Sequence, residues 1–195
     1  MPAPAFKREK VWHPVTRIWH WVFAGSVITG WCLGEFMSFD TVEWHFYTGY
    51  LILSLLLFRV VWGLFGPEQA ALSKLLPSLS SLIGYLKTLT RREPSGLRGH
   101  NPLGALSVLV MILIIGAQAT TGLFMEADDF FEAAPLAQYV SSAAMKSISW
   151  WHHFLSSVIL VLVCLHVAAV LFYLLWKKEN LISAMITGWK QVRDQ

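Results

Sequence analysis

Four long apolar segments limit what this chain can fold into more than any other feature of its sequence. They run over Ile18–Leu33, Trp44–Leu64, Pro102–Met125 and Ser147–Trp176. Arg59 is the one formally charged residue within them. A helix crosses the hydrocarbon core of a bilayer with about 20 apolar residues, and a chain that is 55% hydrophobic and 14% charged is unlike a soluble domain. We therefore expect an all-α integral membrane protein, folded as a single domain over residues 1–195.

The expected transmembrane helices cover residues 14–37, 44–65, 102–125 and 147–176. The first helix follows Lys7, Arg8 and Lys10, as the apolar part of a cleavable signal would. No small-residue cleavage site follows it, however, so we interpret it as a retained transmembrane helix.

The distribution of basic residues predicts the topology. Fourteen of the fifteen Lys and Arg residues fall on one side of a four-helix arrangement, in or near the N-terminus, the loop over 65–101 and the C-terminus. Basic loops remain on the cytoplasmic side, so we expect a multi-pass protein of the bacterial inner membrane with both termini in the cytoplasm. Because topology explains these basic residues, they indicate no nucleic-acid partner.

The loop between the second and third helices contains leucines at helical spacing from Leu72 to Leu89. We expect an amphipathic interfacial helix over about 68–92 on the cytoplasmic surface, with a break near Pro77. Its basic residues would face phospholipid headgroups; they are Lys74, Lys87, Arg91 and Arg92. The tail from Lys177 onward has a similar pattern and is a candidate for a second such helix.

Five histidines lie within or at the ends of the apolar segments, and four of them, His20, His45, His152 and His166, can be matched in pairs. His152 and His166 are fourteen residues apart on one predicted helix, which returns to within about 40° of the same face about 21 Å further along. Matching the histidines by membrane depth pairs His20 with His166 near the cytoplasmic side and His45 with His152 near the outer side. Intramembrane histidines are functional by default, and neutral imidazole is a strong ligand for haem iron.

The two pairs predict a four-helix bundle that encloses two b-type haems, each held by one histidine from each of two helices. Interhelical hydrogen bonds are the alternative role for each histidine taken singly. Cys32 and Cys164 are outside any C-x-x-C-H sequence, so the haems would be held by ligation and packing alone.

The remaining histidines are weaker candidates for the same role. His153 is displaced from the face of His166 by about 220°, which favours His152 as the ligand without excluding His153. His13 precedes Pro14 at a helix start and is interpreted as interfacial. His100 precedes the third helix, where it either caps the loop or contacts a haem propionate or a quinone.

Arg59 follows His45 by the same fourteen residues and so shares its face at the depth of the inner pair. It would contact the inner haem's propionates or extend to the lipid headgroups. Arg17, one turn from His20, is a second candidate for the propionates. Gly49, one turn beyond His45, would let a porphyrin approach the backbone, although small residues also serve plain helix packing.

The loops opposite the basic ones are acidic. They contain Glu35, Asp40, Glu43, Glu126, Asp128, Asp129 and Glu132 against a single basic residue, Lys146. The asymmetry either follows from topology alone or steers a basic soluble redox partner to the outer face.

Several ordered motifs resemble the bacterial cytochrome b561 family, which includes the cytochrome b subunits of nickel-iron hydrogenases. The motifs are Arg17-Ile18-Trp19-His20-Trp21 with Thr29-Gly30-Trp31, His45 followed by Gly49-Tyr50, residues 58–66 (FRVVWGLFG), Gly99-His100-Asn101-Pro102-Leu103-Gly104-Ala105, and residues 180–188 (NLISAMITG). The likeness covers nearly the whole chain, and it is specific because the motifs occur in order.

The resemblance implies a di-haem protein that exchanges electrons between the quinone pool and a periplasmic partner, with His20, His45, His152 and His166 as axial ligands. The partner would be a multihaem cytochrome c, a hydrogenase or a dehydrogenase, and a homodimer is compatible with the family. Two alternatives stay open: a stand-alone haem reductase or oxidase acting on a small molecule such as superoxide or ferric iron, and a haem-free proton-coupled transporter.

Overall fold

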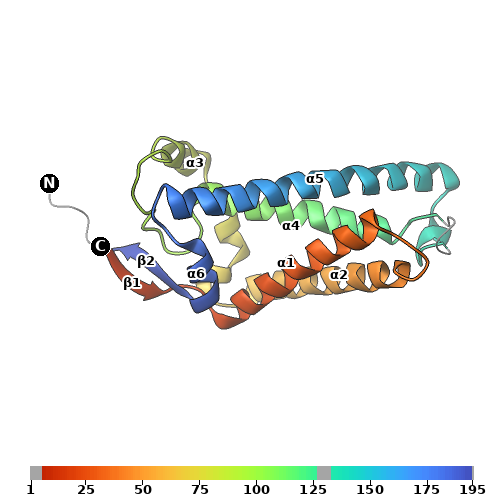
Figure 1. Cartoon of the computed structure of the whole chain (residues 1–195), viewed down its shortest axis with the longest axis horizontal. Coiled ribbons are helices and arrows are strands. Elements are labelled where there is room, and N and C mark those ends of the chain that lie inside the picture. Colours follow the sequence, from red (N-terminus) through yellow and green to blue (C-terminus); the bar gives the residue numbers. More distant parts are fainter. Residues whose placement is uncertain (1–5, 127–132, 195) are drawn as a thin grey trace. The chain divides into compact units, whose positions relative to one another are not determined.

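The computed structural model describes residues 6–126 and 133–194, and Figure 1 shows their helices and strands in chain order. The chain divides into two compact units. The central unit contains His20–Arg59 and Met111–Leu162. The terminal unit contains the chain up to Trp19, Val60–Val110 and the chain from Val163 onward.

The four long helices occur close to where the sequence predicts them. They are α1 (Pro14–Glu35), α2 (Val42–Phe65), α4 (Pro102–Gly122) and α5 (Ser142–Leu175). Proline and a capping side chain explain where two of these helices, α1 and α4, begin. Proline takes the first position of α1 and α4, where its missing N–H costs nothing, and the Asn101 side chain caps α4 by accepting a hydrogen bond from the Gly104 N–H at 2.8 Å.

Three of these helices, α2, α4 and α5, are long and apolar enough to cross a membrane. Most of their surface is not covered by protein, and large side chains such as Leu57, Leu113 and Leu165 are at least 60% exposed. Exposure on this scale suits helices whose outer faces contact lipid. In α1 the apolar residues are interrupted by Arg17 and His20, and its role as a fourth span stays a prediction.

The segment predicted as one interfacial helix over 68–92 is instead three short elements. Two 3₁₀ turns, Glu68–Ala70 and Leu72–Leu75, precede α3 (Leu79–Leu86). The predicted break near Pro77 is confirmed, because α3 begins just after it with Ser78 as its cap, whose Oγ accepts from the Ser81 N–H at 3.2 Å.

A two-stranded sheet in the terminal unit departs from the all-α expectation. Strand β1 (Phe6–Lys10) pairs antiparallel with β2 (Trp189–Arg193). Helix α6 (Leu181–Thr187) packs beside them, in the tail that the sequence marked for a second amphipathic helix. It ends at Gly188, whose φ of 87° allows the left-handed cap. A small core of Val11, Trp12, Ala184 and Val192 holds these elements together.

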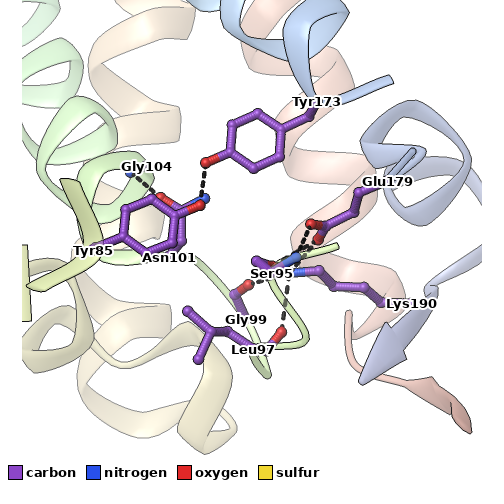
Figure 2. A network of polar contacts seen from close by, with 9 residues as sticks. All are labelled: Tyr85, Ser95, Leu97, Gly99, Asn101, Gly104, Tyr173, Glu179 and Lys190. Carbon is purple, nitrogen blue, oxygen red and sulfur yellow. Dashed lines mark hydrogen bonds and ion pairs between the residues drawn. The ribbon is translucent and has the colours of Figure 1, made fainter. Parts of the chain in front are cut away.

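A buried ion pair joins β2 to the segment after α5, and its hydrogen bonds reach the loop before α4 (Figure 2). Lys190 Nζ lies 3.1 Å from Glu179 Oε1, and both side chains are less than 5% exposed. Glu179 also accepts hydrogen bonds from the N–H and hydroxyl of Ser95, while Lys190 donates to the carbonyl oxygens of Leu97 and Gly99. Both carboxylate oxygens of Glu179 and the ammonium group of Lys190 therefore take part in one buried hydrogen-bond network.

We expect Glu179→Gln to destabilise the terminal unit, because it leaves the buried Lys190 ammonium without its anionic partner. Removal of one member of such a pair costs about 3–5 kcal/mol. Thermal unfolding of the detergent-solubilised protein, followed by circular dichroism, would show a lower midpoint. Glu68→Gln is the matched control, since the Glu68–Lys74 pair is exposed and its loss should leave the midpoint unchanged. Equal midpoints for both variants would contradict the role given to the buried pair.

Candidate functional site

Two histidines from different helices meet in the central unit. His45 lies on the first turn of α2 and His152 lies on α5. Their ring centres are 6.3 Å apart, with the ring planes inclined at 79°. A metal ion bound to one nitrogen of each of two imidazoles at about 2.0 Å places the ring centres about 6 Å apart. The predicted outer pair is therefore brought together at a separation that suits one shared metal ion.

Helix α1 orients the imidazole of His45. Nδ1 lies 3.0 Å from the carbonyl oxygen of Gly30, and because a carbonyl only accepts hydrogen bonds, Nδ1 carries the proton. One turn further along α1, Gly34 lets the ring approach the backbone, since a Cβ there would lie 3.0 Å from His45 Cε1. The lone pair of His45 is consequently on Nε2.

Helix α4 orients His152 in the same way. The Thr121 hydroxyl donates its proton to the carbonyl oxygen of Gln118 at 2.8 Å, so it accepts from His152 Nδ1, 3.0 Å away. The side-chain nitrogen of Gln118 lies 3.1 Å from His152 Nε2 and donates to it. A Cβ at Gly122 would lie 3.1 Å from His152 Cε1. Both imidazoles therefore keep the Nε2 lone pair, which is the form that binds a metal.

The donor set fits a haem rather than a metal ion held by protein side chains alone. Within residues 6–126 and 133–194, no group of three or more His, Cys, Asp or Glu side chains is placed to hold a metal ion. Two imidazoles leave the other coordination positions to another ligand, which a porphyrin supplies.

The burial of α5 distinguishes His152 from its neighbour. His152 is half-buried, whereas His153 is exposed. His152, Ile159, His166 and Tyr173 follow one another at seven-residue intervals, and Ile159 and Tyr173 are 6% and 5% exposed. The preference for His152 over His153 thus agrees with the face that α5 turns toward the protein.

The other predicted pair is divided between the two units. His20 belongs to the central unit and His166 to the terminal unit, and each is half-buried. His20 contacts the neighbouring Trp21 edge-on at 5.1 Å between ring centres. Their pairing stays a prediction.

Two of the secondary candidates lie on α2, beyond His45. Arg59 is 5% exposed, so its charge lies within the protein rather than on its surface. At Gly49 an added Cβ would meet nothing within 4 Å, which leaves open space beside the backbone one turn from His45. Both positions are compatible with the roles that the sequence suggests for them, and those roles stay predictions.

The two secondary candidates in the terminal unit make contacts that the sequence did not indicate. Arg17 Nη1 donates to the carbonyl oxygen of Ile186 near the end of α6, where a basic side chain satisfies a free carbonyl. His100 is exposed, and its ring contacts Trp12 edge-on at 4.7 Å between centres. Roles toward propionates or quinone stay predictions for both residues.

Five residues of the site were missed by the sequence analysis: Gly30, Gly34, Gln118, Thr121 and Gly122. Signals for them are present in the sequence. Gly30 and Gly34 are four residues apart, on one face of α1. Gln118 and Thr121 are polar residues in a largely apolar helix, where polar side chains need partners.

The chain is similar to known membrane cytochromes. Residues 11–188 match the family model described as prokaryotic cytochrome b561. Two proteins described as probable Ni/Fe-hydrogenase B-type cytochrome subunits are 27% identical to it. The one from Azotobacter chroococcum mcd 1 aligns over 94% of this chain and 89% of its own length. The one from Rhizobium leguminosarum bv. viciae aligns over 98% and 93%. A third, from Cupriavidus necator, is 24% identical over 97% of this chain and 90% of its own length.

The matched region covers well over half of the chain and includes all four predicted ligands. Its spanning helices and its pair of imidazoles are the features that a membrane cytochrome requires. The chain belongs to the prokaryotic cytochrome b561 family, and this membership implies a multi-pass membrane protein that transfers electrons with haem b.

Proposed function

We propose that the protein carries electrons across the membrane through two bis-histidine b-type haems and links the quinone pool to a periplasmic redox partner. One observation carries the proposal: His45 and His152 lie 6.3 Å apart between ring centres, and each presents a lone pair on Nε2. When bound, haem b supplies a carrier for one electron at a time.

The residues around His45 and His152 would hold the outer haem in different ways. His45 and His152 would hold the haem iron through Nε2, and Gly34 and Gly122 leave room for their rings. Thr121 and the Gly30 carbonyl hold the Nδ1 protons. With both axial positions taken by imidazole, the iron would have no open position for small ligands, which favours electron transfer over chemistry at the metal.

For the inner haem we propose His20 and His166 as ligands, with Arg59 as the cation nearest its propionates. His166 follows His152 on α5 by about 21 Å. The arrangement would place one haem toward each surface of the membrane, with quinone reacting near the cytoplasmic side. His100 and Arg59 are the candidates for that reaction.

Two observations support the proposed redox partner: the acidic residues of the predicted outer loops and the descriptions of the relatives. The relatives are described as hydrogenase cytochrome subunits, which makes a hydrogenase one candidate and a basic multihaem cytochrome another. Among the acidic residues of the predicted outer loops, Glu35, Asp40, Glu43 and Glu126 are exposed. Asp128, Asp129 and Glu132 lie outside the described residues. An exposed acidic face favours a partner with a basic docking surface.

His152→Ala is expected to remove one of two haems, because it deletes one axial ligand of the outer site. The haem content of the purified variant, measured per chain, should fall to half that of the wild type. His153→Ala is the matched control, since this neighbour is exposed, and it should retain both haems. A His152→Ala protein with full haem content, or a wild type without a reduced b-type absorption band, would contradict the proposal.

Thr121→Val should alter one haem without removing it. The variant loses the acceptor for the His152 Nδ1 proton, which makes the imidazole a weaker donor to iron; loss of such a partner typically weakens metal binding by about 10–100-fold. In a redox titration, one transition should move to higher potential and the other should stay. Thr121→Ser keeps the hydroxyl and should titrate like the wild type. If Val and Ser variants titrate alike, Thr121 does not act through His152.

Electron transfer from quinol through the protein to a basic cytochrome tests the proposed link between the quinone pool and a partner at the acidic face. In proteoliposomes with quinol, the rate of reduction of an external basic multihaem cytochrome should fall as ionic strength rises, because salt screens the acidic face. A fast rate that is independent of salt would argue against electrostatic docking. Reoxidation of the reduced protein by superoxide or ferric iron alone would favour a stand-alone reductase.

A further inference from the structure

A cavity of about 330 Å³ lies in the terminal unit, apart from the histidine pair. Its lining includes the hydroxyl-bearing residues Ser81 and Tyr85 of α3 and Thr88 just after that helix. The rest of the lining comes from the loop after α3, from Lys177 after α5 and from Arg193 at the end of β2. A cavity of this size accepts a small ligand or the headgroup of a larger one.

Charge in the cavity wall favours an anion. Three cationic side chains, Arg91, Lys177 and Arg193, line it against a single carboxylate, Glu93. Lys177 is 2% exposed, and its ammonium group is held by the carbonyl oxygens of Leu89 and Arg91 at 3.2 and 3.0 Å. Its positive charge is thereby fixed at the wall and kept from solvent. The guanidinium groups of Arg91 and Arg193 are exposed and suit the planar recognition of an oxyanion.

A chain of hydrogen bonds leaves a donor facing the cavity. The Asn101 side-chain oxygen accepts from Gly104 N–H, so its amide nitrogen is the group that donates to Tyr173. The hydroxyls of Tyr173 and Tyr85 are hydrogen-bonded to each other (Figure 2). If each group donates once, Tyr173 donates to Tyr85, and the Tyr85 proton is directed to an acceptor in the cavity.

The other face of α3 places the cavity at the membrane surface. Leu79, Ile83 and Leu86 are 71%, 47% and 47% exposed. At 100° per residue they lie opposite the row formed by Tyr85 and its neighbouring hydroxyls. An apolar helix face left open in a membrane protein lies at the boundary of the acyl chains. The cavity behind it is then at the level of the lipid headgroups.

We propose that this cavity binds the phosphate group of an anionic phospholipid. The phosphate would accept hydrogen bonds from Tyr85 and from the guanidinium groups of Arg91 and Arg193, and such charge-assisted bonds are the strong ones. Lipid bound here would contact α3, the loop before α4 and the C-terminal strand together. The terminal unit would thus be stabilised by lipids of the cytoplasmic leaflet.

The test uses the full-length, haem-loaded protein in nanodiscs of phosphatidylcholine, into which phosphatidylglycerol is titrated. The unfolding midpoint should rise with phosphatidylglycerol in the wild type. Arg91→Gln and Tyr85→Phe should each require about tenfold more of this lipid for the same rise. Arg92→Gln is the matched control, because its side chain lies over Trp176 rather than in the cavity wall, and it should respond like the wild type. Unchanged haem spectra would show that the variants are folded.

Three outcomes would overturn the proposal. Equal responses of Arg91→Gln and Arg92→Gln would show that the lipid acts through surface charge alone. An equal rise with inorganic phosphate in place of phosphatidylglycerol would identify a soluble anion as the ligand. A short-chain quinone that abolishes the response to phosphatidylglycerol would identify the cavity as a quinone site.

Discussion

The structure depends on the requirement that an imidazole within a membrane has hydrogen-bond or metal partners for its nitrogens. In the central unit this requirement is met at Nδ1 of both rings, and at Nε2 of His152 by the side-chain nitrogen of Gln118. The Gly30 carbonyl and the Thr121 hydroxyl take the Nδ1 protons of His45 and His152. Both rings are thereby held in the same tautomer, and the nitrogen that keeps a lone pair is Nε2 in each; a metal at His152 would replace the hydrogen bond from Gln118.

Small residues make this arrangement sterically possible. A Cβ at Gly34 or Gly122 would come within 3.0 or 3.1 Å of a ring carbon, so the imidazole would have to move to accept a side chain there. The ligands come from α2 and α5, and the groups that orient them come from α1 and α4. All four long helices therefore contribute to one site, which explains why its parts are distributed along the whole length of the chain.

Features that repeat with the period of an α-helix, or that follow from proline, could be predicted from the sequence. The break at Pro77 follows from proline chemistry, and α3 begins just after it. The choice of His152 over His153 follows from residue spacing and stays a prediction, with His152 half-buried and His153 exposed. The sheet of β1 and β2 was missed, because FKREK is a five-residue charged strand whose partner is at the other end of the chain. Thr121 and Gln118 were missed for a similar reason, since their role depends on which helix faces α5.

The central claim is that His45 and His152 are ligands of one haem iron. The most direct measurement is a redox titration of His152→Met, because replacing one axial histidine with methionine raises the potential of a haem. The account predicts that one of two transitions moves to higher potential while the other stays at its wild-type value. A titration identical to that of the wild type would contradict the claim.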